Sequence, residues 1–167
     1  MPYAASLIDW FALFVLTAAL IAAALSDAVT YLIPNRYSAV IVLAFFFYAI
    51  GKPLSFSLHG LAVGGLLFVG GAILFARGMV GGGDVKLLAA TGLWAGFDLI
   101  ALLGVSSAIA ACVLALAQLT PLRRLLPAHP GGAPAGTDFR SKLRQPMPFG
   151  VAVALGGICV ALARLVS

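Results

Sequence analysis

The sequence predicts an all-α polytopic membrane protein with about six transmembrane helices. Of its 167 residues, 63% are hydrophobic and only 9% are charged, and the mean hydropathy is +1.13. Soluble domains carry about 25% charged residues, so this chain lacks the polar surface that a water-soluble fold needs. We expect a single membrane-embedded domain over residues 1–167.

The expected helices follow from the length of each apolar run. A helix rises about 1.5 Å per residue, so roughly 20 apolar residues cross the core of a bilayer. The expected spans cover residues 6–32, 37–50, 58–76, 85–96, 99–119 and 149–166. The first has no basic residue ahead of it and is expected to be retained rather than cleaved as a signal. Residues 120–146 are rich in Pro, Gly and basic residues, which predicts a mobile loop.

The distribution of basic residues favours one orientation. With the N-terminus facing away from the cytoplasm, most of them fall at cytoplasmic ends or loops: Arg36, Arg77, Lys86, Arg123, Arg124, Arg140, Lys142 and Arg144. Only Lys52 and Arg164 fall on the other side. Because Lys and Arg concentrate in cytoplasmic loops, we expect an N-out, C-out arrangement. The net charge of +5 then reports topology, and no nucleic-acid partner is expected.

The chain contains no glutamate, and its five acids separate by position. Asp9 and Asp98 fall near the outer ends of spans, where water is close, and Asp138 lies in the basic loop. Asp27 and Asp84 lie in apolar segments on the expected cytoplasmic side. A charged group at membrane depth costs about 2.5–3.5 kcal/mol on insertion scales and is functional by default. The candidate functional acids are therefore Asp27 and Asp84.

Asp27 precedes Pro34 by seven residues, and proline ends or kinks a helix. If the first helix continues to this proline, Asp27 lies roughly 10 Å inside its end, with Tyr31 on the same face. An acid that snorkels to the interface is the alternative. Since aspartate is too short to snorkel far, an inward-facing role is favoured.

Asp84 directly follows Gly81, Gly82 and Gly83. A helix N-cap would explain the acid but not the glycines, which permit positive φ and close backbone approach. We therefore expect a non-helical glycine-rich loop before the fourth span, able to admit an extended peptide and present Asp84 to it. Lys86 is expected to point elsewhere on the helix, as a topology anchor.

The two candidate acids come from different spans but fall on the same side of the membrane. Two carboxylates in a restricted site do not readily ionise together, so they can share one proton. Aspartic proteolysis uses such a pair: one carboxylate activates a water molecule while its protonated partner polarises the scissile carbonyl. This chemistry requires no metal and no cofactor.

Two stretches of the sequence resemble the motifs of the prepilin peptidases, which are membrane aspartic proteases of bacteria. "GGGDVKLLAATGLWAG" resembles their GxGD signature, and "SDAVTYLIPNRYS" resembles their first-aspartate motif. The resemblance implies that Asp27 and Asp84 are the catalytic pair. It implies site-shaping roles for the motif residues around them: Gly81, Gly82, Gly83, Lys86, Pro34 and Asn35.

The resemblance also implies a substrate, the short basic leader of a type IV pilin-like precursor, cut at the cytoplasmic face of the bacterial inner membrane. Larger members of the family carry a cytoplasmic domain with two CxxC pairs and methylate the new N-terminus. This chain has only Cys112 and Cys159, which form no such pair and are expected to be buried. It therefore resembles the short, peptidase-only form found in Flp (Tad) pilus systems.

Two other classes of function stay open. A small proton-coupled transporter also needs inward-facing acids and broken helices, although the sequence shows no repeated half. A non-catalytic pilus assembly protein would keep the fold while tolerating the loss of one acid, and here both are present. The glycine spacing at 60–64 and at 92–96 is expected to reflect close helix packing.

Overall fold

The computed structural model of the protein describes residues 7–119 and 148–166. Its helices are α1 (Leu7–Thr30), α2 (Asn35–Ala49), α3 (Leu54–Ala76), α4 (Gly82–Leu119) and α6 (Phe149–Val166). The described residues contain no strand, which confirms the all-α class. By length and composition, four of the helices could cross a membrane: α1, α3, α4 and α6. With 15 residues, α2 is shorter.

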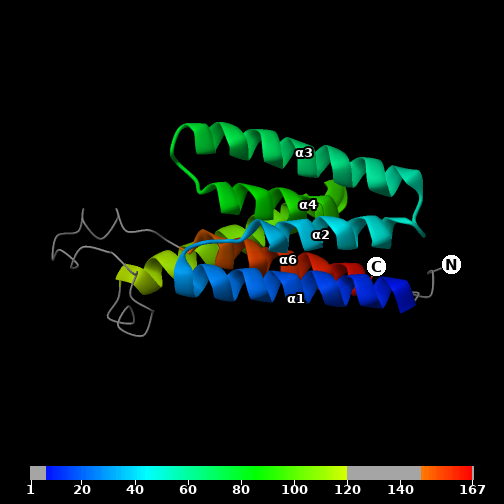
Figure 1. Cartoon of the computed structure of the whole chain (residues 1–167), viewed down its shortest axis with the longest axis horizontal. Helices are drawn as coiled ribbons and strands as arrows, with labels where there is room; N and C mark the ends of the chain where they lie inside the picture. The colour runs from blue at the N-terminus through cyan, green and yellow to red at the C-terminus, as the bar shows by residue number, and fades with distance from the viewer. Residues whose placement is uncertain (1–6, 120–147, 167) are drawn as a thin grey trace.

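α4 consists of two helical arms that meet at Gly96, where the backbone is not helical (φ 54°, ψ −167°). The first arm covers residues 82–95 and the second residues 97–119, close to the fourth and fifth expected spans. Figure 1 shows the second arm turning back along the first. Positive φ is readily adopted only by glycine, so Gly96 serves the reversal rather than the helix packing expected of it.

The helical segments alternate in direction, which places their ends at two opposite ends of the bundle (Figure 1). The motif end contains the ends of α1 and α3 and the starts of α2, α4 and α6. The far end contains the start of α1, the reversal at Gly96 and the end of α6. Arg36, Arg77 and Lys86, which the sequence predicts to share one side of the membrane, all belong to the motif end. The loop residues expected on the same side lie outside the described residues: Arg123, Arg124, Asp138, Arg140, Lys142 and Arg144.

The first arm of α4 is the central helix of the bundle. Most of its side chains are buried: Val85, Leu87, Ala89, Ala90, Thr91, Leu93, Trp94 and Ala95. The Trp94 indole N–H donates to the Ile41 carbonyl of α2 at 3.1 Å, and its ring packs edge-on against Phe45, with centroids 6.0 Å apart. A helix that is apolar all round belongs in the interior, and here it carries Asp84 at its start.

Glycines allow α3 to pack closely on this central arm. A Cβ added at Gly60 would lie 2.5 Å from the Leu93 carbonyl oxygen, and one at Gly64 would lie 2.7 Å from Leu93 Cδ2. In return, a Cβ at Gly92 would lie 2.5 Å from Leu67 Cδ1. The packing role expected for these three glycines is thus confirmed, and it agrees with the small-residue interfaces of membrane helices.

The outer surface of the bundle is strongly apolar, with exposed side chains such as Phe14, Leu66 and Ile109. Monomeric soluble proteins rarely expose large apolar patches, whereas a multi-pass membrane protein presents them to lipid. The expectation that both cysteines are buried was wrong. Cys112 is exposed on α4 and Cys159 is only half-buried on α6, because their helix faces turn toward this outer surface.

The two acids of the far end differ in their surroundings. Asp98 is exposed, as expected, and lies 3.8 Å from Arg164 Nη2. Asp9 lies in the first turn of α1, near a helix end as expected, but it is buried, with only 8% of the residue exposed. Lys52 Nζ donates to its carboxylate at 3.2 Å and sits 4.6 Å from the centre of the Tyr48 ring. The loop between α2 and α3 brings this cation over Asp9.

Candidate active site

Asp27 lies in the last turn of α1, which ends sooner than expected. The helix stops at Thr30 because Tyr31 adopts a positive φ of 54°, with its N–H donating to the Asp27 carbonyl at 2.9 Å. The Ser26 hydroxyl donates to the Leu32 carbonyl at 2.8 Å and holds the following turn. Asp27 therefore lies about one turn from the helix end, not 10 Å inside it. Tyr31 leaves the helix instead of lying one turn further along its face.

The Asp27 carboxylate is turned inward and meets the start of α6. The residue is 4% exposed, and its Oδ2 accepts the Val151 N–H at 3.2 Å. The Gly150 N–H is a second backbone donor to the same carboxylate. The first N–H groups of a helix have no partner within it, and the helix dipole favours a negative group there. Asp27 thus joins α1 to α6.

Gly150 is a site residue that the sequence reasoning missed. A Cβ at this position would lie 2.9 Å from Asp27 Oδ2 and would collide with Ile33 Cδ1. Only glycine lets the start of α6 approach the acid so closely. A signal was available in "PMPFG", because a proline just before an apolar run indicates a helix N-terminus, and such a terminus attracts a carboxylate.

Asp84 occupies the third position of α4, whose first residue is Gly82. The Val85 N–H donates to the Gly81 carbonyl at 3.2 Å, so Gly81 caps the helix. The half-buried Asp84 carboxylate reaches back and accepts the Gly81 N–H, as the acid of a capping box does. It also interacts electrostatically with Asp27. The structure therefore brings the two candidate acids together.

The prediction of a non-helical glycine loop directly before Asp84 was wrong. Gly82 and Gly83 already belong to α4, and the positive φ in this region occurs earlier, at Gly78 (70°). The glycines serve close approach instead: a Cβ at Gly83 would lie 3.1 Å from Ile33 Cβ. Helical hydrogen bonding from Gly81 onward satisfies backbone groups that an open loop would leave unpaired.

The turn between α1 and α2 fills the space between the two acid-bearing regions. Ile33 faces both Gly83 of α4 and Gly150 of α6, so one side chain packs against the start of each helix. Pro34 has the N-cap position of α2, and Asn35 is its first residue, which confirms the turn expected at these residues. Ile33 was not singled out from the sequence, although it lies inside the first-aspartate motif.

Lys86, expected to point elsewhere on the helix as a topology anchor, reaches the start of α2. Its Nζ donates to Asn35 Oδ1 at 2.9 Å, which connects α4 to the start of α2. The side chain is long enough to cross from one motif to the other while its head stays exposed. The contact joins two residues to which the resemblance assigned site-shaping roles.

The electrostatics of the site are unusual for a membrane interior. Asp27 lies at the N-terminus of α6 and Asp84 at the N-terminus of α4, so the positive ends of two helix dipoles converge on the pair. Within residues 7–119 and 148–166, no ion pair joins either acid to a basic side chain. Two carboxylates without a neutralising cation are suited to sharing a proton, and a shared proton enables general acid–base chemistry.

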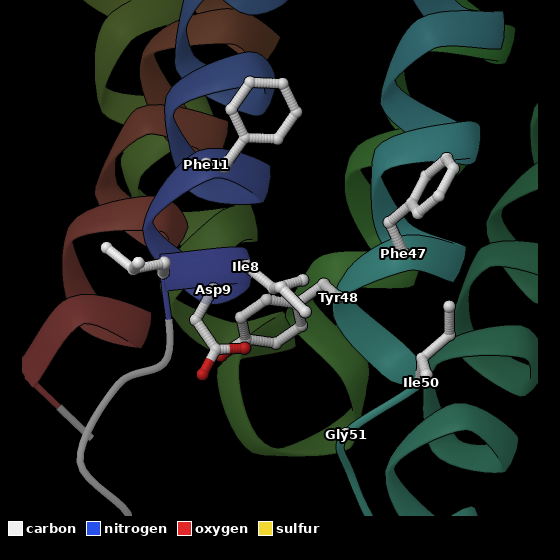
Figure 2. A pocket seen from close by; sticks show the side chains of 8 residues that line it. Ile8, Asp9, Phe11, Phe47, Tyr48, Ile50 and Gly51 are labelled. Atoms are coloured by element: carbon white, nitrogen blue, oxygen red, sulfur yellow. The ribbon is translucent and has the colours of Figure 1, made fainter.

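A separate cavity of ≈ 430 Å³ lies at the far end and contains neither acid of the pair. Figure 2 shows it between the start of α1 and the end of α2, lined by Ile8, Phe11, Phe47, Tyr48 and their neighbours. Asp9, which borders it, precedes Asp27 by 18 positions on the same helix, or about 27 Å of helix. The candidate active site and this apolar cavity are therefore distinct.

Comparison with known proteins bears on this arrangement. The model of the Type IV leader peptidase family matches residues 14–116, which is more than half of the chain. The match includes both acids, the glycines before Asp84 and the Lys86–Asn35 contact. No curated protein and no solved structure matches the chain significantly.

Proposed function

The chain belongs to the type IV leader peptidase family, and from this premise we propose that it is a membrane aspartic endopeptidase that cuts type IV pilin-like precursors. The family membership supports leader peptidase activity in general. The main support for an aspartic mechanism is that Asp27 and Asp84 lie close enough to interact electrostatically. They come from separate helices, lie at two helix N-termini, and have no basic side chain as an ion-pair partner within the described residues.

The proposed reaction uses one proton shared between Asp27 and Asp84. The ionised carboxylate takes a proton from a water molecule, whose oxygen attacks the scissile carbonyl carbon, while the protonated partner donates to the carbonyl oxygen. The tetrahedral intermediate then breaks its C–N bond: the nitrogen takes the proton held by one carboxyl group, and a hydroxyl of the intermediate returns its proton to the other carboxylate as the new C=O forms. The products are a carboxylic acid and an amine, and the pair again holds one proton. These steps need no metal and no cofactor.

The neighbouring motif residues would shape this site around an extended substrate. Gly81, Gly82 and Gly83 keep side-chain bulk away from Asp84, so a peptide backbone can approach the carboxylate. Pro34 and Asn35 form the turn that faces α4, with Lys86 bound to it at 2.9 Å. In this proposal these residues position the acids and the substrate, and they do not themselves transfer protons.

The proposed substrate is the short basic leader of a pilin-like precursor together with its hydrophobic helix. The apolar outer surface of the bundle suits a hydrophobic helix that arrives from the surrounding lipid. The charge pattern supports a cytoplasmic motif end, and we propose that the membrane is the bacterial inner membrane. A basic leader would then be cut on the side where it is made. We propose the short, peptidase-only form, as in Flp (Tad) pilus systems, without methyltransferase activity.

Co-expression with pilin-like precursors from the same genome tests the proposal. We expect a shift in precursor mobility, a new N-terminus identified by sequencing, and a mature-protein mass without an added methyl group. Activity of the purified protein is expected to survive EDTA. A precursor that stays intact beside well-expressed protein would favour a non-catalytic assembly role or a proton-coupled transporter. A methylated N-terminus would contradict the peptidase-only form.

A further inference from the structure

Arg164, near the end of α6, is a nearly buried cation that the proposed reaction does not use. Its side chain is only 11% exposed. Nε donates to the Trp94 carbonyl and Nη2 to the Ala95 carbonyl, each at 3.1 Å. The guanidinium also lies over the Phe56 ring, 5.0 Å from its centre. The rigid guanidinium fork supplies donors to both carbonyls at once.

These two carbonyls belong to the last turn of the first arm of α4, where the chain reverses at Gly96. The last carbonyls of a helix have no partner within it, and an unsatisfied backbone group costs several kcal/mol within a bilayer. Arg164 supplies the missing donors. A Cβ at Gly96 would lie only 3.7 Å from Arg164 Nη2, so the reversal and the guanidinium pack directly against each other.

The same helix also holds the other acid-bearing region. α6 begins with the backbone N–H groups that bind Asp27 and ends with Arg164, which binds the arm that starts with Asp84. Because roughly 17 Å of helix separates Asp84 from Ala95, a tilt of about 4° at the reversal would move Asp84 by about 1 Å. An attachment that holds the arm at the reversal therefore also limits how far Asp84 can move at the motif end.

We propose that Arg164 is a positioning residue for the acid pair: by capping the first arm of α4 at Gly96, it sets the placement of Asp84 relative to Asp27. α6 runs along the bundle (Figure 1). It is bound to α1 at one end and to the central arm at the other. The kinetic part of this inference rests on the proposed function, whereas its geometric part does not.

The kinetic test compares Arg164→Met, which keeps the length but removes the donors, with Arg164→Lys, which keeps a cation. We expect Arg164→Met to lower kcat for precursor cleavage by about 10- to 100-fold, because a shift of about 1 Å can cost 100-fold. KM should stay within about twofold, and Arg164→Lys should recover part of the loss. Asp98→Asn is the matched control, since its exposed carboxylate lies 3.8 Å from Nη2. It is expected to keep wild-type kcat.

The geometric test needs no activity. Asp27→Cys and Asp84→Cys are combined in a protein that lacks Cys112 and Cys159, and a short bifunctional thiol reagent joins the two positions. Cross-linking is measured as an initial rate, which depends on the alignment of the two thiols; we expect a fast rate with Arg164 present and a slower one in Arg164→Met. If Arg164→Met does not accumulate, the same two measurements are made on Arg164→Lys. We then expect a partial loss of both kcat and cross-linking rate.

Unchanged cross-linking in the Arg164 variants would overturn the proposal, even with a lowered kcat, because Arg164 would then act on turnover by another route. Wild-type kcat in a precursor-cleaving Arg164→Met protein would also overturn it. If the protein with Arg164 intact cleaves no precursor, the proposed function fails. The cross-linking result still decides whether Arg164 places the two acids.

Discussion

The two ends of the bundle treat their acids differently. At the far end, each described acid lies beside a cation: Lys52 donates to Asp9 at 3.2 Å, and Arg164 lies 3.8 Å from Asp98. At the motif end, Asp27 and Asp84 interact electrostatically with each other and accept hydrogen bonds from backbone N–H groups. In the described parts of the chain, neither forms an ion pair with a basic residue.

This difference distinguishes carboxylates that hold the fold together from carboxylates that are free to exchange a proton. A carboxylate beside a cation at membrane depth is neutralised as a pair and holds segments together. Two carboxylates held only by backbone dipoles can still exchange a proton, because no cation keeps both of them ionised. The contrast predicts that substitutions of the two acids at the motif end remove activity, while substitution of Asp9, the partner of Lys52 at the far end, changes stability.

The largest effect is expected from Asp27→Asn or Asp84→Asn. An amide cannot serve as the general base, so each change should lower precursor cleavage by about 10²- to 10⁴-fold, with the protein still folded and inserted. Asp27→Glu and Asp84→Glu should each cost on the order of 100-fold, since one methylene displaces the carboxylate by about 1 Å. The measurement is precursor cleavage in detergent, normalised to protein level by immunoblot.

The double variant sharpens this prediction. Because the two acids act as one unit, it should be no worse than either single variant. Asp98→Asn and Asp138→Asn serve as controls and should remain active. A stable Asp27→Asn or Asp84→Asn protein with full activity would refute the aspartic mechanism.

The next largest effect is expected from Gly150→Ala. The new Cβ would lie 2.9 Å from Asp27 Oδ2 and would collide with Ile33, so the acid or the start of α6 must move. We expect a loss of about 100-fold in kcat, as for a 1 Å displacement. Gly65→Ala is the matched control, because a Cβ there has no neighbour within 4 Å. Equal activities of the two variants would show that the approach of α6 to Asp27 does not matter for turnover.

A smaller effect is expected from breaking the contact between the two motifs. Lys86→Met removes the hydrogen bond to Asn35 (2.9 Å). A hydrogen bond of this kind is worth about 0.5–1.5 kcal/mol, which corresponds to roughly 2- to 10-fold in kcat/KM. Asn35→Ala should have a similar effect, and the double variant should add little. Additive losses would indicate that the two residues act independently, for instance on different parts of the substrate.

The smallest effect on turnover is expected from Asp9→Asn. Asp9→Asn removes the charged partner of Lys52, a pair with side chains 11% and 24% exposed, and should lower the free energy of unfolding by about 1–3 kcal/mol. The kcat of the protein that stays folded should not change. Thermal unfolding in detergent and cleavage kinetics measure the two quantities separately. A lower kcat without a loss of stability would remove the contrast between the two ends.

The amino-acid sequence alone determined the helical class and the approximate spans, and it predicted which two acids are the candidate pair. These follow from local properties: apolar runs of bilayer length, the high cost of an acid within them, and turn signals such as the proline after Asp27. The break in α4 was also visible in part, because the expected spans ended and resumed around residues 96–99. The choice of Asp27 and Asp84 over Asp9 and Asp98 was likewise available from position along the chain.

The partners of these residues came only from the tertiary structure. The early end of α1 depends on the positive φ of Tyr31, which a non-glycine residue rarely adopts. The role of Gly150 became visible only when α6, more than 120 positions after Asp27, met the acid. Arg164 and Lys86 appeared in the sequence as topology signals, whereas the fold makes them partners of backbone carbonyls and of Asn35. Long-range contacts of this kind depend on how helices pack in three dimensions, and neither spacing nor hydropathy encodes that packing.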